Sequence, residues 1–97
     1  MEIGLNAVVL SLKGRDSGKL FVVVGLEADV NYVRIADGRL RSLQKPKKKK
    51  LKHLKAVGRM DEAFTTDRGL HKALHAFAVR GESEPEGGYQ LVEGRCN

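Results

Sequence analysis

The chain has 97 residues, of which 41% are hydrophobic and 31% are charged, and this suits one small folded domain with a short appendage. No apolar run approaches the roughly 20 residues of a membrane-spanning helix, and the N-terminus lacks the basic-then-apolar order of a secretory signal. The single cysteine, Cys96, excludes an intramolecular disulfide and a cysteine-rich zinc site. We therefore expect a cytoplasmic protein.

The net charge of +6 is unevenly distributed along the chain. Residues 34–59 contain eleven Lys or Arg and a single acid, Asp37, whereas the other residues carry seven basic and eleven acidic groups. A mildly acidic body with one concentrated basic segment indicates a polyanionic partner.

The first two expected strands lie in the N-terminal third of the chain. Ala7–Leu12 is apolar and β-prone, and it ends at Lys13–Gly18, a segment dense in turn residues. Leu20–Val24 is apolar on both faces and is followed by Gly25, where we expect the strand to stop. Such a run is typical of a strand that is central in a small barrel or covered on both sides.

A third strand is expected over Val30–Ala36, where apolar and polar residues alternate. The Asp37-Gly38 pair that follows predicts a two-residue hairpin turn, because both central positions need a positive φ. In that register Ile35 and Leu40 face the core together. The opposite face would present Tyr32, Arg34, Arg39 and Arg41. Arg34 and Arg41 would lie directly across from each other in this register, and a phosphate bound between them would relieve their repulsion.

Gln44–Lys50 has no hydrophobic residue and contains a proline, so we predict an exposed basic loop, with Leu51–Leu54 as a short closing strand or turn. About five short strands joined by glycine-containing turns predict a mainly β fold, a small SH3-like barrel, over residues 1–58.

Residues 59–97 have a different character, and we expect a C-terminal extension there. A helix over about 67–80 is predicted, with Thr66 or Asp67 as its N-cap and Gly81 at its end. The acidic stretch Glu82–Gly88 predicts a mobile tail. The apolar positions with helical spacing are Leu70, Ala73, Leu74, Phe77 and Ala78.

The order and spacing of several fragments between Ala7 and Leu54 resemble the KOW family of RNA-associated modules. Within that family the chain resembles large-subunit ribosomal proteins of the archaeal and eukaryotic fourteen-e type and their small bacterial relatives. The fragments are Val8-Val9-Leu10-Ser11, Gly14-Arg15-Asp16-Ser17-Gly18-Lys19, Phe21-Val22-Val23-Val24, Tyr32-Val33-Arg34-Ile35-Ala36-Asp37-Gly38, Lys45-Pro46-Lys47-Lys48-Lys49-Lys50 and Lys52-His53-Leu54.

The resemblance implies an SH3-like barrel that binds RNA, ribosomal RNA in particular, without catalysis. We also expect no cofactor, ribosomal proteins as further partners, and a monomer when the protein is free. Asn6 stands where the family usually has glycine, and asparagine is the next best residue for a left-handed backbone. The extension from residue 59 onward lies outside the resemblance.

We expect RNA to be held mainly through its backbone, by displacement of counterions from phosphates. Tyr32 could also stack on an unpaired base, and Arg15 either forms a local ion pair with Asp16 or contacts RNA itself. The expected RNA-contacting residues are Lys13, Arg15, Lys19, Tyr32, Arg34, Arg39, Arg41, Lys45, Lys47, Lys48, Lys49, Lys50, Lys52, His53 and Lys55. The expected structural turn residues are Gly14, Asp16, Gly18, Asp37 and Gly38.

Other functions have weaker support in the sequence. His71 and His75 have the spacing of metal ligands on a helix, but no third ligand is evident, so we interpret them as surface histidines. No nucleophile stands with a base and an orienting acid, and no Walker loop is present, so we expect no enzyme. The alternative function is a protein-interaction adaptor that docks a partner through the barrel or the helix. Binding to an anionic membrane ranks last, since no basic amphipathic helix or lipidation signal is present.

Overall fold

The computed structural model describes residues 3–61 and 63–80, which form one antiparallel sheet and one helix. The sheet has five strands in the order β4-β3-β2-β1-β5. This confirms the prediction of a mainly β fold with a C-terminal helix. The elements are β1 (Ala7–Ser11), β2 (Leu20–Leu26), β3 (Tyr32–Ala36), β4 (Lys47–Lys50), the 3₁₀ turn η1 (Leu51–His53), β5 (Leu54–Arg59) and α1 (Asp67–Arg80).

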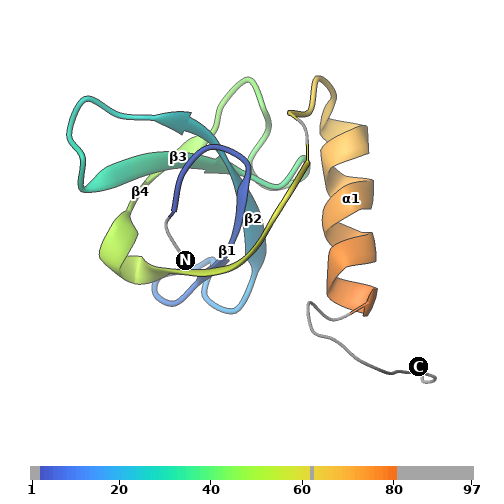
Figure 1. The fold of residues 1–97 in the computed structure, drawn as a ribbon, viewed down its shortest axis with the longest axis horizontal. Helices are drawn as coiled ribbons and strands as arrows, with labels where there is room; N and C mark the ends of the chain where they lie inside the picture. Colours follow the sequence, from blue (N-terminus) through green and yellow to red (C-terminus); the bar gives the residue numbers. More distant parts are fainter. Residues whose placement is uncertain (1–2, 62, 81–97) are drawn as a thin grey trace.

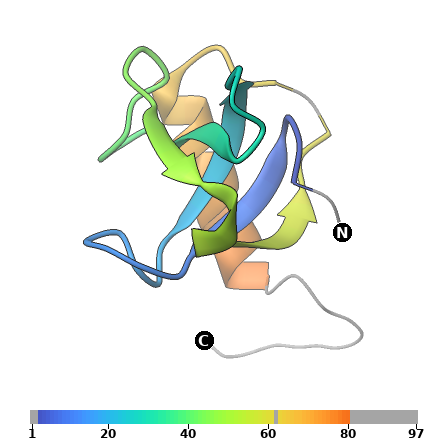
Figure 2. The ribbon, with the colours of Figure 1, turned by 90° about the vertical axis from the view of Figure 1, so that its left-hand side faces the viewer.

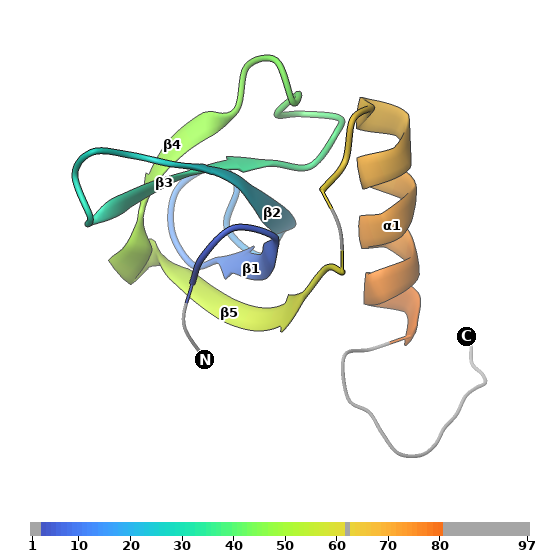
Figure 3. The ribbon, with the colours of Figure 1, turned by 45° about the horizontal axis from the view of Figure 1, so that its top comes forward.

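The sheet is strongly curved, and its strands wrap around a set of buried side chains (Figure 3). These side chains come from alternate positions of the strands, since successive residues of a strand point to opposite faces. Phe21 and Ile35, both fully buried, are the largest of them. The inner core consists of Ala7, Val9, Phe21, Val23, Val33, Ile35 and Leu54.

Helix α1 covers the other face of the sheet, beside β1 and β2 (Figure 1). Leu70 and Leu74 of the helix pack in one buried cluster with Val8, Val22 and Ala36 of the sheet. The two-sided apolar character of β2 is thereby explained, because one set of its side chains enters the inner core and the other meets the helix. The prediction that this strand is covered on both sides is confirmed.

The helix has the predicted bounds and one of its two predicted caps. The Thr66 hydroxyl accepts a hydrogen bond from the Gly69 N–H at 3.1 Å, the usual N-cap arrangement. Asp67 has a different partner: its carboxylate accepts the Leu43 N–H at 2.7 Å and so ties the start of the helix to the segment before β4. The predicted helix end at Gly81 and the acidic tail lie outside the described residues.

Several strand boundaries differ from the prediction. Strand β1 ends at Ser11 instead of Leu12, and β5 runs from Leu54 to Arg59, well beyond the short closing strand or turn expected over Leu51–Leu54. Strand β2 continues through Gly25 to Leu26, because a register shift between Val23 and Gly25 absorbs one residue as a β-bulge opposite β3. Strand β3 begins at Tyr32, and Val30 before it is 81% exposed.

The predicted two-residue hairpin at Asp37-Gly38 is wrong. Asp37 accepts hydrogen bonds through Oδ1 from the backbone N–H groups of Arg39 at 2.9 Å and Arg41 at 2.8 Å, so its side chain closes a wider turn. Strand β3 then pairs with β4 and not with the residues just after the turn, and Ile35 lies opposite Lys47.

Four of the residues expected in left-handed conformations adopt them, but Asp37 does not have the positive φ that the predicted two-residue turn required. Gly14 and Gly18 have φ of 86°, Gly38 has φ of 79° and Asn6 has φ of 69°. In the described part of the chain, no helix is long and apolar enough to cross a bilayer.

Candidate nucleic-acid interface

The four-lysine run forms strand β4, and its side chains alternate between two environments. The prediction of an exposed loop over these residues is wrong, because β3 offers its free edge to them. Lys47 and Lys49 lie opposite Ile35 and Val33 and so share the inner face of the sheet with them. Lys48 and Lys50 lie opposite Arg34 and Tyr32 and so share the outer face of the sheet with them. Strand β4 itself lies on the side of the molecule away from α1 (Figure 2).

The two outward lysines lie over the ring of Tyr32. The Lys48 amine is 4.7 Å from the ring centroid and the Lys50 amine is 5.9 Å from it. Contacts of this kind are worth about 0.5–1 kcal/mol at exposed sites. The register explains them, since Tyr32 lies directly opposite Lys50 and Lys48 is two residues away on the same face.

Arg34 completes this outer face, opposite Lys48. Its Nε donates a hydrogen bond to the Glu27 carboxylate, and the pair is also a salt bridge. The hydrogen bond from Arg34 is the main reason that the pKa of Glu27 lies below its ordinary value. We call Tyr32, Arg34, Lys48 and Lys50 the Tyr32 surface. Its two lysines form no salt bridge with any described residue.

A hollow of about 380 Å³ adjoins the Tyr32 surface. It lies between the turn before β3 and η1, and the Asp29 carboxylate accepts the Asn31 N–H within that turn at 2.9 Å. Aromatic, amide, carboxylate and ammonium groups therefore meet in one opening. Its lining residues are Asp29, Asn31, Tyr32, Lys50, Leu51 and Lys52.

The inward side of β4 meets Asp16, which comes from the loop between β1 and β2. Asp16 Oδ2 lies 3.1 Å from the Lys47 amine and 3.2 Å from Arg41 Nη2, and the Asp16 side chain is only 5% exposed. Burial works against ionisation of this carboxyl, but the hydrogen bonds and charges of Lys47 and Arg41 outweigh it and lower the pKa of Asp16. Among the described residues Arg15 forms no salt bridge, so Asp16 joins the loop to β4 and does not hold Arg15.

Lys49 is the most buried of the lysines and forms no salt bridge with a carboxylate in the described part of the chain. Its amine donates a hydrogen bond to the Lys13 carbonyl at 2.8 Å, and the residue is 8% exposed. Burial, and then the charge of Lys47, lowers the pKa of Lys49; Asp16 acts in the opposite direction. Lys47 and Lys49 therefore both contact the first loop, the segment between β1 and β2.

The two inward lysines should respond differently to removal of their charge. We expect Lys49→Met to preserve the free energy of unfolding or raise it by up to about 1 kcal/mol, because the substitution removes a buried charge that no described carboxylate neutralises. The Lys13 carbonyl, which loses the amine as its partner, belongs to an exposed residue and can bind water instead. Lys47→Met should cost about 1 kcal/mol, because it removes a partner from buried Asp16 while the exposure of Lys47 moderates the loss. Urea unfolding followed by circular dichroism measures both. Equal destabilisation by the two changes would contradict this assignment.

The predicted arginine face does not form. Arg34 is on the outer face of β3, but Arg41 turns inward to Asp16 and Arg39 is exposed in the turn after β3. Leu40, which was expected to face the core, is 57% exposed. The cause is the wider Asp37 turn, which leaves these residues outside any strand.

The remaining predicted cations are spread over several segments. Among them, His53 is half-buried in η1, and its pKa is lowered, first by burial and then by the charges of Lys13 and neighbouring lysines. The others are exposed: Lys13, Arg15, Lys19, Lys45, Lys52 and Lys55.

Sequence reasoning did not identify Glu27 or the hollow. Glu27 meets Arg34 only because of the bulge in β2, which no local motif specifies. The described residues include no group of three or more side chains suited to a metal, and His71 and His75 therefore have no third ligand there. Comparison with known proteins finds no matching family model and no curated relative.

Proposed function

We propose that the protein binds RNA through the Tyr32 surface. The observation that carries the proposal is the alternation along β4, which directs Lys48 and Lys50 outward over the ring of Tyr32, beside Arg34. Two cations that form no salt bridge among the described residues, next to an aromatic ring, provide charge for phosphates and a flat face for a base.

The hollow beside Tyr32 supports binding of a single-stranded segment. An unpaired base entering it meets the tyrosine, while Lys50 and Lys52 at its edge meet the adjacent phosphates. The polar groups of Asp29 and Asn31 supply hydrogen-bonding partners for a base edge. Backbone contacts provide most of the affinity, and the single aromatic adds a preference for unpaired nucleotides.

A finer description of the fold belongs to the same proposal: the curved sheet is a small SH3-like barrel of the KOW type. The left-handed Asn6 and the glycine-bounded loop between β1 and β2 are consistent with it. Its RNA would then be ribosomal, the setting cytoplasmic and ribosome-associated, and the role non-catalytic. The adaptor alternative is weaker, because Leu70, Leu74 and Phe77, the large apolar residues at helical spacing in α1, already pack against this chain's own sheet. Val79, near the end of α1, is the exception and is 72% exposed.

The test is a filter-binding series with single-stranded RNA at several salt concentrations. We expect Lys48→Gln/Lys50→Gln to weaken binding about tenfold or more for many sequences alike, and to flatten the salt dependence by about 0.7 per lost phosphate contact. The matched control is Arg68→Gln/Lys72→Gln, which removes two exposed charges from α1.

The outcomes separate the surface from simple net charge. Equal loss of affinity in both double variants would show that only total charge matters and would overturn the proposal. Tyr32→Ala should reduce affinity for single strands more than for duplexes, because only unpaired bases reach the ring.

A further inference from the structure

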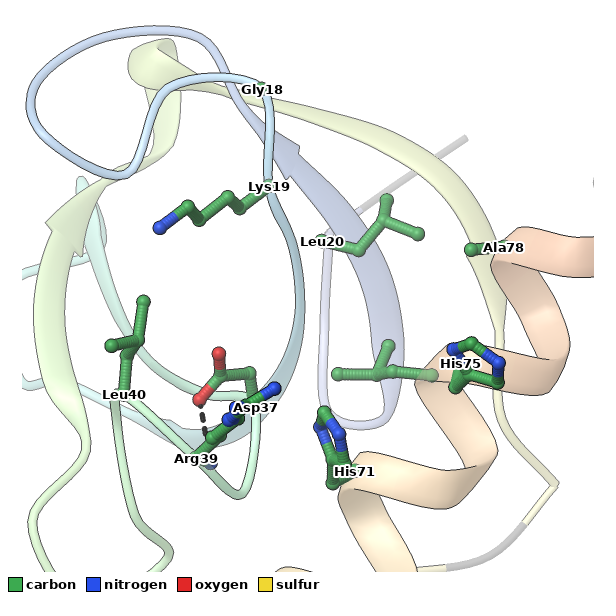
Figure 4. A pocket seen from close by; sticks show the side chains of 10 residues that line it. Gly18, Lys19, Leu20, Asp37, Arg39, Leu40, His71, His75 and Ala78 are labelled. Atoms are coloured by element: carbon green, nitrogen blue, oxygen red, sulfur yellow. Dashed lines mark hydrogen bonds between the residues drawn. The ribbon is translucent and has the colours of Figure 1, made fainter.

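A second opening lies beside α1 (Figure 4), and it shares no lining residue with the hollow next to Tyr32. It has a volume of about 550 Å³ and lies between α1, the start of β2 and the turn after β3. Small-molecule sites usually measure about 300–1,000 Å³. Its principal side chains come from three separate segments: Lys19 and Leu20, Asp37 to Leu40, and His71 to Ala78.

The apolar part of the pocket comes from both layers of the fold. Leu20 of β2 and Leu74 of α1 belong to the cluster that joins sheet and helix, and Ala78 continues the helix wall. Leu40 borders the opening and is 57% exposed, so its side chain is accessible to a ligand there. The floor therefore offers contact to a flat or apolar group.

The charged part of the pocket is asymmetric. Lys19 and Arg39 approach from different segments, both are exposed, and neither forms a salt bridge with the described residues (Figure 4). Asp37 also lines the pocket, but its Oδ1 accepts the N–H groups of Arg39 and Arg41, which leaves Oδ2 for a ligand hydroxyl. Two cations near one carboxylate favour an anionic ligand that also carries hydroxyl groups.

Two imidazole rings supply the remaining feature. His71 and His75 are four residues apart, so they share one face of α1, and both line the opening (Figure 4). Imidazole rings are among the side chains on which nucleobases stack.

We propose that this pocket binds a nucleoside monophosphate unit, either as a free nucleotide or as part of an RNA strand. The phosphate lies between Lys19 and Arg39, the ribose hydroxyls reach Asp37, and the base rests against the histidine rings and the apolar floor. This goes beyond RNA binding by the Tyr32 surface, since a free nucleotide would occupy the pocket without that surface.

The first experiment follows the histidine imidazole signals of the full chain by NMR during titration with AMP. The chain has three histidines, and His53 in η1 does not line the pocket, so it serves as an internal control. We expect the signals of His71 and His75 to move and saturate while that of His53 moves less. Inorganic phosphate and adenosine are titrated in parallel, and each should bind at least about tenfold more weakly than AMP, because each lacks half of the contacts. Absence of a saturable change at His71 and His75, or equal changes at all three histidines, would overturn the proposal.

Variants then identify the cations and the source of the ligand. Lys19→Gln/Arg39→Gln should weaken AMP binding about tenfold or more, whereas Lys48→Gln/Lys50→Gln should leave it unchanged. Unchanged AMP affinity in the first variant would contradict the assigned phosphate position. If the first variant also weakens binding of single-stranded RNA, the pocket holds a nucleotide of the strand; if it weakens only AMP, the ligand is a free nucleotide. If the wild-type chain binds AMP but not single-stranded RNA, RNA binding by the Tyr32 surface is refuted while the nucleotide pocket is retained.

Discussion

Asp16→Asn is expected to lower the free energy of unfolding by about 2–3 kcal/mol. The substitution preserves shape but removes the charge that faces both Lys47 and Arg41. Breaking a buried ion pair typically costs about 3–5 kcal/mol, and the partial exposure of the two cations reduces this cost. Within residues 3–61 and 63–80 the buried Arg41 Nε has no hydrogen-bond partner, so no second acceptor faces that atom there.

The measurement is urea unfolding of the variant beside a matched control. Asp61→Asn removes the same charge from an exposed position after β5, and it should change stability by no more than about 0.5 kcal/mol. A similar effect of both substitutions would mean that Asp16 contributes only to net charge and not to the attachment of the first loop to β4.

The same carboxylate should make stability depend on pH in acid. The folded-state pKa of Asp16 lies below its ordinary value of 3.8, so the stabilisation is fully present above that value and is lost as the pH falls through the folded pKa. The difference in unfolding free energy between the wild-type protein and Asp16→Asn should therefore shrink as the pH falls below about 4. A difference that stays constant down to pH 2 would contradict the assigned ion pairs.

The lysine run shows where local sequence reasoning fails. Four consecutive lysines have low β-propensity and no apolar residue, so composition predicts a solvated loop. In the structure the free edge of β3 provides the hydrogen-bonding partners, and each inward lysine finds an oxygen acceptor from the first loop. Such long-range partners are not encoded near the run, and for that reason the different roles of Lys48 and Lys49 could not be separated from the sequence.

Features that depend on neighbouring residues were predicted well. The bounds of α1 follow from its apolar spacing and from Thr66, and the alternation in β3 correctly places Tyr32 on the outer face. The arginine positions failed because they depended on a turn of two residues, while the Asp37 side chain forms a wider one. The hydrogen bonds of the Asp37 side chain thus place Arg39 at the helix-side pocket and Arg41 beside Asp16, and not together on one sheet face.

Gly38→Ala is expected to cost about 3 kcal/mol or more, and to loosen α1 from the sheet. Gly38 has φ of 79°, which alanine adopts only with strain. A Cβ at this position would also overlap the Asp67 carbonyl oxygen and lie 3.0 Å from the His71 backbone nitrogen. Both obstacles are backbone atoms of the first turns of α1, so they can move only if the helix moves.

Gly18→Ala separates backbone strain from this steric conflict. Gly18 has φ of 86°, but nothing lies within 4 Å of an added Cβ, so only the conformational cost of about 1–2 kcal/mol remains. Hydrogen exchange should show faster opening of the amides around Leu70 and Leu74 in Gly38→Ala, and ordinary protection there in Gly18→Ala. If both variants lose the same stability and keep a protected helix, the close approach of the turn to α1 does not control helix docking. A loosened helix in Gly38→Ala would also open the pocket formed by Arg39 and His71, so AMP binding should weaken in that variant.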